Sequence, residues 1–196
     1  MLTVITSEGP VNEEALLINE LFEEGLEILH IRKPFSTLNE LKMLLDKIHA
    51  RHHDKIALHQ HHEIANDYTI IRLHFTEALR LSLGEKLDPE MKQDKIFSTS
   101  IHDPSKLIQL SNVFNYTFLG PVFPSISKPG YNNKWENKSV IKMGDTPDII
   151  AIGGIDESNA GEIRDLHFDG IGLLGAIWKN PPQATKTFKA IRALWN

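Results

Sequence analysis

Basic and polar side chains with the chemistry of an anion site follow one short apolar run near the N-terminus. His30, Arg32 and Lys33 close this run, and Pro34 comes directly after them. In an extended strand alternate residues face the same way, so His30 and Arg32 share a face. An arginine guanidinium holds two phosphate oxygens in a fork, and a neighbouring lysine adds a point charge. The segment therefore indicates a phosphate-bearing ligand, or alternatively an exposed basic turn that the proline terminates.

A second polar segment carries hydroxyls at alternate positions. Ser125 and Ser127 are followed at once by Lys128, a set of donors that fits phosphate oxygens, although a polar loop has the same composition. Glycines directly follow two further apolar runs, as Gly153 and Gly154 in one and as Gly175 after Leu174 in the other. Glycine lets backbone N–H groups approach a ligand closely, so these positions are candidate phosphate contacts.

Composition excludes several classes of protein. The chain has 196 residues, a formal charge of −5 and no cysteine, so disulfides, thiol nucleophiles and thiolate zinc sites are excluded. The acidic balance gives no reason to expect nucleic-acid binding. No apolar run approaches the ~18 residues of a membrane span, and the first residues lack the features of a signal peptide. These observations predict a cytoplasmic protein without a membrane partner.

Strand-like apolar runs recur along the chain, separated by amphipathic segments. We predict eight strands, at Leu2–Thr6, Ile28–Arg32, Ile56–His59, Ile70–His74, Ile96–Ser100, Tyr116–Leu119, Ile149–Ile152 and Gly170–Leu174. Their spacing of roughly 25 residues matches one βα unit. The prediction is an α/β protein forming a single (β/α)8 TIM barrel over residues 1–196, with a doubly wound open sheet as the alternative. In such barrels the site lies where strands end, which is where the polar segments fall.

Taken together, these segments resemble the thiamine phosphate synthase family and its thiazole tautomerase relatives, which share this barrel. The likeness rests on Leu2–Thr6, His30–Lys33, Ser100–His102, Gly120–Pro129, Ala151–Ile155 and Asp169–Ile177. It implies a transferase of thiamine biosynthesis that joins hydroxymethylpyrimidine diphosphate to thiazole phosphate and releases pyrophosphate. It also implies small phosphorylated substrates as partners, and a homodimer is one assembly open to such a barrel.

The resemblance also assigns roles to individual residues. Arg32 and Lys128 would hold the leaving diphosphate, and Ser100 would lie beside the pyrimidine. His30 stands where the family has a glutamine and is a further candidate catalytic group, since histidine titrates near neutrality. The remaining expected substrate or phosphate contacts are Lys33, His59, Gln60, Ser125, Ser127, Gly153, Gly154, Leu174 and Gly175.

Departures from the family pattern concern its magnesium ion, which the resemblance implies as cofactor. The two carboxylates that hold this ion in the family fall at His59–Gln60 and near Ala78–Leu79, leaving Gln60 and Glu77 as the nearest substitutes. Magnesium prefers carboxylate and water oxygens, so these replacements count against magnesium and against the synthase activity. Pro121 stands where the tautomerase has its catalytic histidine, which counts against tautomerisation. A metal-independent site using His30 or His59, or a non-catalytic barrel binding phosphate ligands, stays open.

The other histidines suggest two further interpretations. His59, His61 and His62 could hold a transition metal if the strand continued through them. We expect His52 and His53 to lie at a solvated helix terminus, where positive charge favours the helix dipole.

Overall fold

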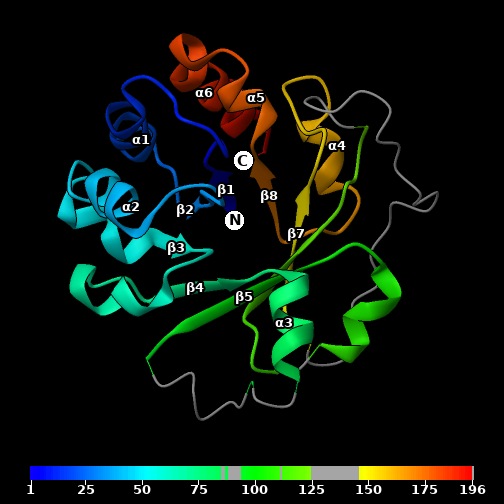
Figure 1. Cartoon of the computed structure of the whole chain (residues 1–196). Coiled ribbons are helices and arrows are strands. Elements are labelled where there is room, and N and C mark those ends of the chain that lie inside the picture. Colours follow the sequence, from blue (N-terminus) through cyan, green and yellow to red (C-terminus); the bar gives the residue numbers. More distant parts are fainter. Residues whose placement is uncertain (85–86, 88–93, 111, 125–145, 196) are drawn as a thin grey trace.

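Eight parallel strands, hydrogen-bonded in chain order, close into one barrel in the computed structural model of the chain (Figure 1). The structure describes residues 1–84, 87, 94–110, 112–124 and 146–195. The strands are β1 Leu2–Ile5, β2 Ile28–Ile31, β3 Ile56–Leu58, β4 Arg72–Phe75, β5 Ile96–Ile101, β6 Tyr116–Leu119, β7 Asp148–Ile152 and β8 Gly170–Leu173. Because β8 pairs with β1, the barrel is closed, which confirms the (β/α)8 prediction and excludes the open sheet.

The fourth strand differs most from its prediction. It begins at Arg72 instead of Ile70, because the Ile70 N–H donates to the Ala65 carbonyl (2.8 Å) at the end of a preceding turn. The other strands agree with the predicted runs to within a residue or two. Apolar runs bounded by polar turns are typical of parallel strands buried on both faces, which is why the pattern located them.

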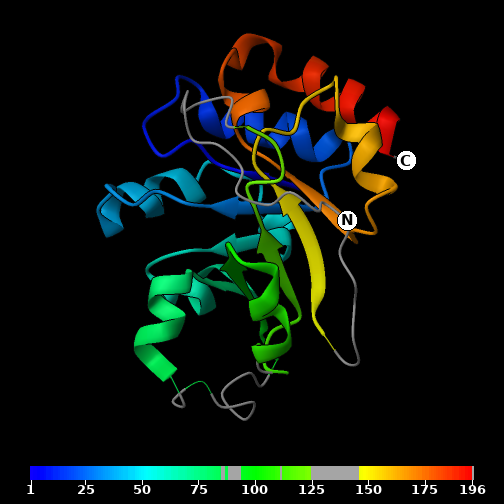
Figure 2. The ribbon, with the colours of Figure 1, turned by 90° about the vertical axis from the view of Figure 1, so that its right-hand side faces the viewer.

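Helices surround the barrel on its outside (Figures 1 and 2). They are α1 Glu14–Glu23, α2 Leu38–Leu45, α3 Glu77–Leu83, α4 Ala160–Arg164, α5 Gly175–Trp178 and α6 Ala184–Trp195, with 3-10 helices at Ala50–Lys55, His62–Tyr68, Pro104–Gln109 and Pro181–Gln183. The Thr37–Glu40 pair forms a capping box that starts α2. Among the described residues, none of the helices has the length and hydrophobicity needed to cross a bilayer.

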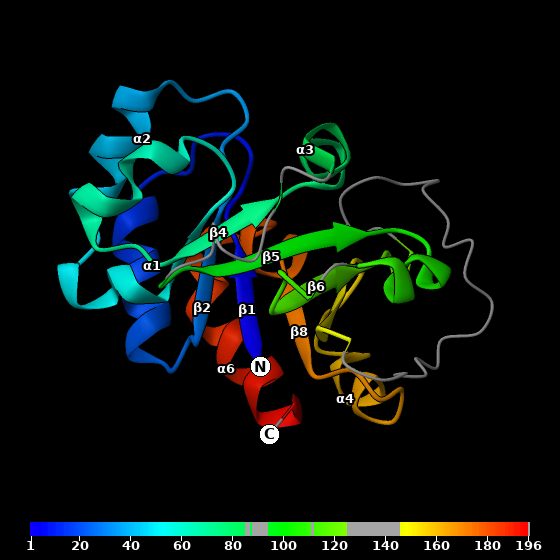
Figure 3. The same cartoon turned by 90° about the horizontal axis from the view of Figure 1, so that it is seen from below.

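The two ends of the described chain lie close together (Figure 3). The Met1 ammonium donates to the Asp169 carbonyl (2.7 Å), which fixes β1 beside β8. Helix α6 packs against α1 and α4, so the last helix closes the ring of helices around the first strand.

The hydrophobic core has two parts. The larger part fills the space between the barrel and its helices. The smaller part lies inside the barrel and includes Ile5, Ile28 and Phe118. Gly172 makes room for the Phe118 ring, since a Cβ there would lie 3.1 Å from Phe118 Cε1. Polar side chains, among them His30, are buried in the same interior, so the inside of the barrel is the place where polar chemistry is concentrated.

Gly120, directly after β6, is expected to tolerate no side chain. An added Cβ would lie 2.1 Å from the Ile152 carbonyl oxygen, and this neighbour is backbone that cannot rotate away. We expect Gly120→Ala to lower the free energy of unfolding by about 1–3 kcal/mol in urea denaturation. Gly161→Ala is the matched control, because a Cβ there meets nothing within 4 Å and alanine favours helix. Equal stability of the two variants would contradict the close packing at Gly120.

Candidate active site at the carboxyl ends of the strands

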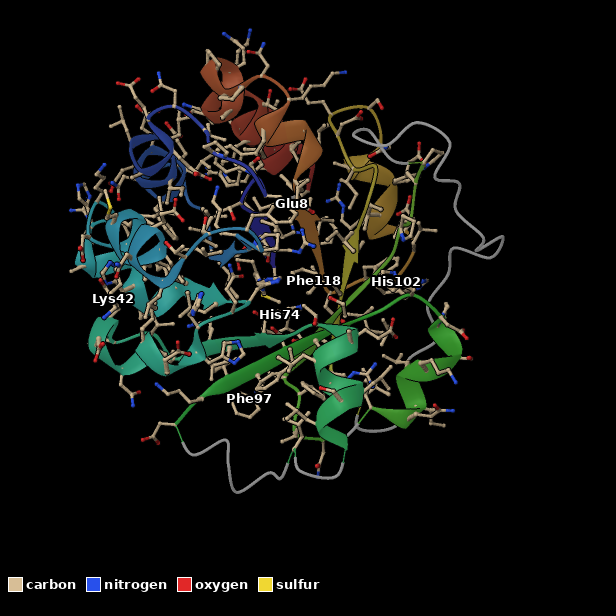
Figure 4. All side chains as sticks on the ribbon, in the orientation of Figure 1. Glu8, Lys42, His74, Phe97, His102 and Phe118 are labelled. Atoms are coloured by element: carbon tan, nitrogen blue, oxygen red, sulfur yellow. The ribbon has the colours of Figure 1, made fainter. Side chains whose placement is uncertain are left out.

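Arg32 lies at the mouth of the barrel, directly after β2, as predicted. Its guanidinium forms an ion pair with Glu8 from the loop after β1, and both side chains are partly exposed (36% and 40%). The Arg32 N–H donates to Thr6 Oγ1 (2.9 Å), which holds the two loops together. Figure 4 shows Glu8 beside β1 and β8, at the rim of the barrel. An anionic ligand can therefore reach Arg32 only in competition with this carboxylate.

Lys33 points away from the mouth into a buried ion pair. Its Nζ donates to both carboxylate oxygens of Glu14 (2.8 and 2.7 Å) and to the Gly9 carbonyl (2.9 Å). Lys33 and Glu14 are only 4% and 8% exposed. Burial raises the pKa of Glu14, and the hydrogen bond from Lys33 opposes that rise. Three acceptors match the three donors of the ammonium, so the predicted phosphate contact would require Lys33 to leave them.

Gln60 joins the loops after β2 and β3. Its Oε1 accepts from the Lys33 N–H (3.3 Å), and its Nε2 donates to the Lys33 carbonyl. The Gln60 side-chain oxygen, which is expected to replace a magnesium ligand, therefore already accepts a hydrogen bond from the Lys33 backbone.

Three histidines meet inside the barrel. His30 lies on β2, His59 follows β3, and His74 lies on β4, and they are between 0% and 8% exposed. His30 Nδ1 lies 2.9 Å from His59 Nε2 and His30 Nε2 lies 2.8 Å from the Tyr116 hydroxyl. Figure 4 shows His74 and Phe118 near the centre of the barrel. His30 thus has the predicted inward direction, but it lies within the barrel and not in its open mouth.

Serine hydroxyls hold the third ring. His74 Nδ1 lies 2.9 Å from Ser98 Oγ, and its Nε2 lies 3.0 Å from Ser100 Oγ. Ser100, predicted beside the pyrimidine, is therefore part of the histidine cluster. Burial lowers the pKa of His74 to about 3 and, as the largest cause, also lowers those of His30 and His59. All three rings are neutral at physiological pH.

Glu77 is the first residue of α3, which follows β4. Its carboxylate lies 3.5 Å from Arg80 Nη2 and 3.9 Å from His102 Nε2. His102 Nδ1 in turn donates to the Gly120 carbonyl (2.8 Å). Glu77 is therefore a partner of basic side chains and of the loop after β6.

The two glycines directly after β7 allow the loop after β6 to pack closely against them. Gly153 and Gly154 have left-handed φ angles of 95° and 67°. A Cβ on Gly153 would lie 2.6 Å from Pro121 Cβ, and one on Gly154 would lie 2.3 Å from the Pro124 carbonyl oxygen. Glycine is required here for close approach of the loop after β6, the same loop that carries the predicted serines and lysine further on.

Leu174 and Gly175 form the start of the short helix α5. Leu174 is the residue preceding the helix, and Gly175 is its first residue. The Trp178 indole donates to the Ile5 carbonyl (2.6 Å), which fixes α5 at the carboxyl end of β1. The two residues thus lie at the mouth where the sequence places a phosphate contact.

Comparison with known proteins decides the family. The family model described as "Thiamine monophosphate synthase" matches residues 2–177. The chain belongs to this family. A thiamine-phosphate synthase of Methanobrevibacter smithii is 27% identical, and the match covers 96% of this chain and 95% of that protein. A second, from Chlamydia caviae, is 32% identical, but the match covers 50% of this chain and about half (49%) of that protein.

Solved structures agree with the family assignment. The thiamine phosphate pyrophosphorylase of Bacteroides thetaiotaomicron superposes with a TM-score of 0.77 at 26% identity, covering 98% of this chain and 96% of that one. The pyrophosphorylase of Pyrococcus furiosus shares the fold, with a TM-score of 0.74 at 19% identity, covering 99% and 94% of the two chains. The resemblance drawn from the sequence is thus confirmed, and with it the expectation of a thiamine phosphate synthase-like enzyme.

Magnesium does not fit the described residues of this family member. At the two expected carboxylate positions the chain has His59–Gln60 and Ala78–Leu79. The Gln60 side chain is hydrogen-bonded to the Lys33 backbone, and Glu77 lies beside the cations Arg80 and His102, which leaves one carboxylate near the site where the family has two. Magnesium selects oxygen ligands, and the imidazole at His59 is a poor substitute.

Other sequence predictions are corrected or lie outside the described residues. Ser125, Ser127 and Lys128 are among the residues that the structure does not describe. His52 and His53 are buried at 7% exposure and not solvated, because His52 stacks on Phe22 (4.5 Å between centroids). β3 ends at Leu58 and His61 is left-handed, facing Glu63, so the proposed metal group of His59, His61 and His62 does not form.

Several site residues had no signal that singled them out. Glu8 and Glu14 occur in an acidic N-terminal segment without a motif, and only the fold brings them to Arg32 and Lys33. Tyr116 could have been found, since alternation places it on the inner face of its strand together with Phe118.

Proposed function

We propose that this chain is a thiamine phosphate synthase, a transferase that joins hydroxymethylpyrimidine diphosphate to thiazole phosphate with release of pyrophosphate. The observation that carries the proposal is the family match over residues 2–177. The position of Arg32 at the barrel mouth supports it, because a leaving diphosphate needs a cation there. The relatives are named thiamine-phosphate synthase and thiamine phosphate pyrophosphorylase, which supports thiamine phosphate as the product and pyrophosphate as the released group.

In the proposed reaction the C–O bond between the pyrimidine methylene and the diphosphate breaks, and the thiazole nitrogen forms the new C–N bond to that methylene. Negative charge grows on the departing diphosphate as the bond breaks. Arg32 would stabilise that charge, with Lys128 as a second predicted cation. Glu8 would yield its place on Arg32 to the diphosphate when the substrate binds.

The remaining predicted contacts complete this proposal. Ser125 and Ser127 stay predicted phosphate contacts, whereas Lys33 would contact phosphate only by leaving its buried ion pair with Glu14. Gly153, Gly154, Leu174 and Gly175 stay predicted contacts of the thiazole phosphate. His30 is proposed as a further catalytic group that acts from inside the barrel, where its ring contacts His59 and Tyr116. A cytoplasmic location, a homodimer and the absence of a nucleic-acid partner also stay predictions.

The role of Arg32 is tested by comparing two arginine variants. Arg32→Ala is expected to lower kcat/KM about 100-fold, because one preorganised donor to the developing charge is lost. Arg51→Ala is the matched control, since Arg51 also pairs with a glutamate, Glu23, but at an exposed site at the last residue of α1. It is expected to leave kcat/KM unchanged. The measurement is the rate of thiamine phosphate formation at varied pyrimidine diphosphate.

Glu8→Gln separates binding at Arg32 from general loss of structure. Removing the competing carboxylate is expected to tighten pyrophosphate binding several-fold in calorimetric titration. If Arg32→Ala retained full activity while Glu8→Gln left pyrophosphate affinity unchanged, the mouth at Arg32 would not be the diphosphate site.

A further inference from the structure

The three buried histidines at the centre of the barrel are close enough to share one ion. One ring nitrogen from each of His30, His59 and His74 can be chosen so that all three atoms lie within 4.8 Å of one another. Around a tetrahedral zinc ion, with Zn–N bonds of about 2.0–2.1 Å, ligand nitrogens lie about 3.4 Å apart. His30 Nδ1 and His59 Nε2 are already 2.9 Å apart. The three rings are thus near enough to bind one ion once the hydrogen bond between His30 and His59 opens and one ring turns.

Hydroxyl groups orient two of the three rings from behind. The Tyr116 hydroxyl contacts His30 Nε2 at 2.8 Å, so that His30 Nδ1 faces the other histidines. Ser98 and Ser100 contact the two nitrogens of His74, so either nitrogen can be turned inward while a hydroxyl holds the other. Metal-binding histidines nearly always have such a partner on the second nitrogen.

His59 has unused hydrogen-bonding capacity. Its Nδ1 is fully buried and has no hydrogen-bond partner among the described residues. A buried, unpaired polar atom costs about 1–3 kcal/mol, and a ligand whose binding turns the ring can remove that cost. The rings are neutral in the fold, which is the form of histidine that binds metals.

The mutual orientation of the rings shows which movement binding requires. The rings of His59 and His74 are stacked at 4.0 Å with an angle of 22°, and His30 stands edge-on to both. Each nitrogen lone pair lies in the plane of its own ring, so two stacked and nearly parallel rings cannot both direct a lone pair at one ion, and one of them must turn about its Cβ–Cγ bond. This torsion is soft, because it joins an sp³ to an sp² atom.

We propose that His30, His59 and His74 form an interior binding site for one divalent transition-metal ion of the class of Zn²⁺ and Co²⁺. Imidazole ligands suit these ions and not magnesium. The ion would link β2, β3 and β4 from inside the barrel and stabilise the fold, since an ion that binds only the folded chain shifts the unfolding equilibrium. The test of this site measures ion content, so its outcome does not depend on whether the chain has the proposed synthase activity.

The test loads the full chain with cobalt. Because the site is buried, the protein is unfolded in denaturant with a chelator and refolded with Co²⁺, and unbound ion is then removed by gel filtration. We expect one Co²⁺ per chain, visible absorption bands of a cobalt–imidazole site, and a higher Tm than that of the chelator-treated protein. His59→Ala and His74→Ala are expected to lose the bound ion and the bands.

The control is a second histidine group on the surface. Glu23, His49 and His52 also lie within reach of a common ion, and the side chains of Glu23 and His49 are exposed. His49→Ala is expected to keep both the ion and the spectrum. If either interior alanine variant fails to fold, His59→Gln replaces it, and ¹⁵N shifts of the wild-type histidine rings are followed on addition of Zn²⁺. Absence of bound cobalt, or cobalt that is lost with His49→Ala and kept without His59, would overturn the proposal.

Discussion

Replacing Lys33 with methionine is expected to lower the free energy of unfolding by about 3–5 kcal/mol, because it leaves a buried carboxylate without its cation. The Lys33 ammonium contacts both oxygens of Glu14, and the pair is almost fully buried. Methionine keeps the length and apolar character of the lysine stem. The decrease in the free energy of unfolding therefore measures the effect of removing the charge and not a change in packing. The measurement is urea denaturation at pH 7.

A double variant and a surface pair make this result specific. Glu14→Leu combined with Lys33→Met removes both charges and is expected to recover most of the lost stability. Lys189→Met is the matched control, because Lys189 also pairs with a glutamate, Glu24, but is 57% exposed, so its loss should cost under about 1 kcal/mol. A Lys33→Met cost as small as that of the control would show that the pair is not buried in solution.

Acidification below pH 6.5 is expected to destabilise the fold steeply. Burial holds the pKa of His74 at about 3 in the folded chain, and those of His30 and His59 are also lowered. In the unfolded chain each histidine titrates near 6.5, so below this pH the unfolded state binds more protons. Stability is therefore full above pH 6.5 and falls as pH drops toward the folded pKa values. His74 alone contributes a loss of about 2 kcal/mol by pH 5.

This pH dependence is measured by urea denaturation between pH 7 and pH 5 with a chelator present. His74→Gln removes one titrating ring and is expected to reduce the mean slope over this range by about 1 kcal/mol per pH unit. His49→Gln, at an exposed position, is expected to leave the slope unchanged. An unchanged free energy of unfolding over this range, or a slope that His74→Gln does not reduce, would show that the interior histidines accept protons without unfolding.

The barrel itself was predictable from the sequence, since its signals are local. Buried parallel strands are short apolar runs, and the Thr37–Glu40 capping box marks a helix start by its spacing alone. The start of β4 could not be predicted in this way. Ile70 has a strand-like side chain, but its N–H is used by the preceding turn, and sequence does not show that competition.

The candidate site was predicted only in part. Arg32 and His30 follow from their place at the end of β2, yet their partners Glu8 and His59 come from other βα units, separated from them by 24 and 29 residues. Lys33 was expected to bind phosphate because it is basic and beside Arg32. Because successive residues of an extended chain face opposite ways, however, the Lys33 side chain lies on the opposite face from that of Arg32, where it forms an ion pair with Glu14.

The most direct test of the proposed synthase activity is product formation by the purified wild-type chain. The protein is incubated with hydroxymethylpyrimidine diphosphate and thiazole phosphate, with Mg²⁺ and separately with a chelator, and products are followed by mass spectrometry. We predict thiamine phosphate and pyrophosphate in equal amounts. Strict dependence on Mg²⁺ would place the ion on the substrate or on residues beyond those described. Neither product from folded protein under either condition would contradict the assignment.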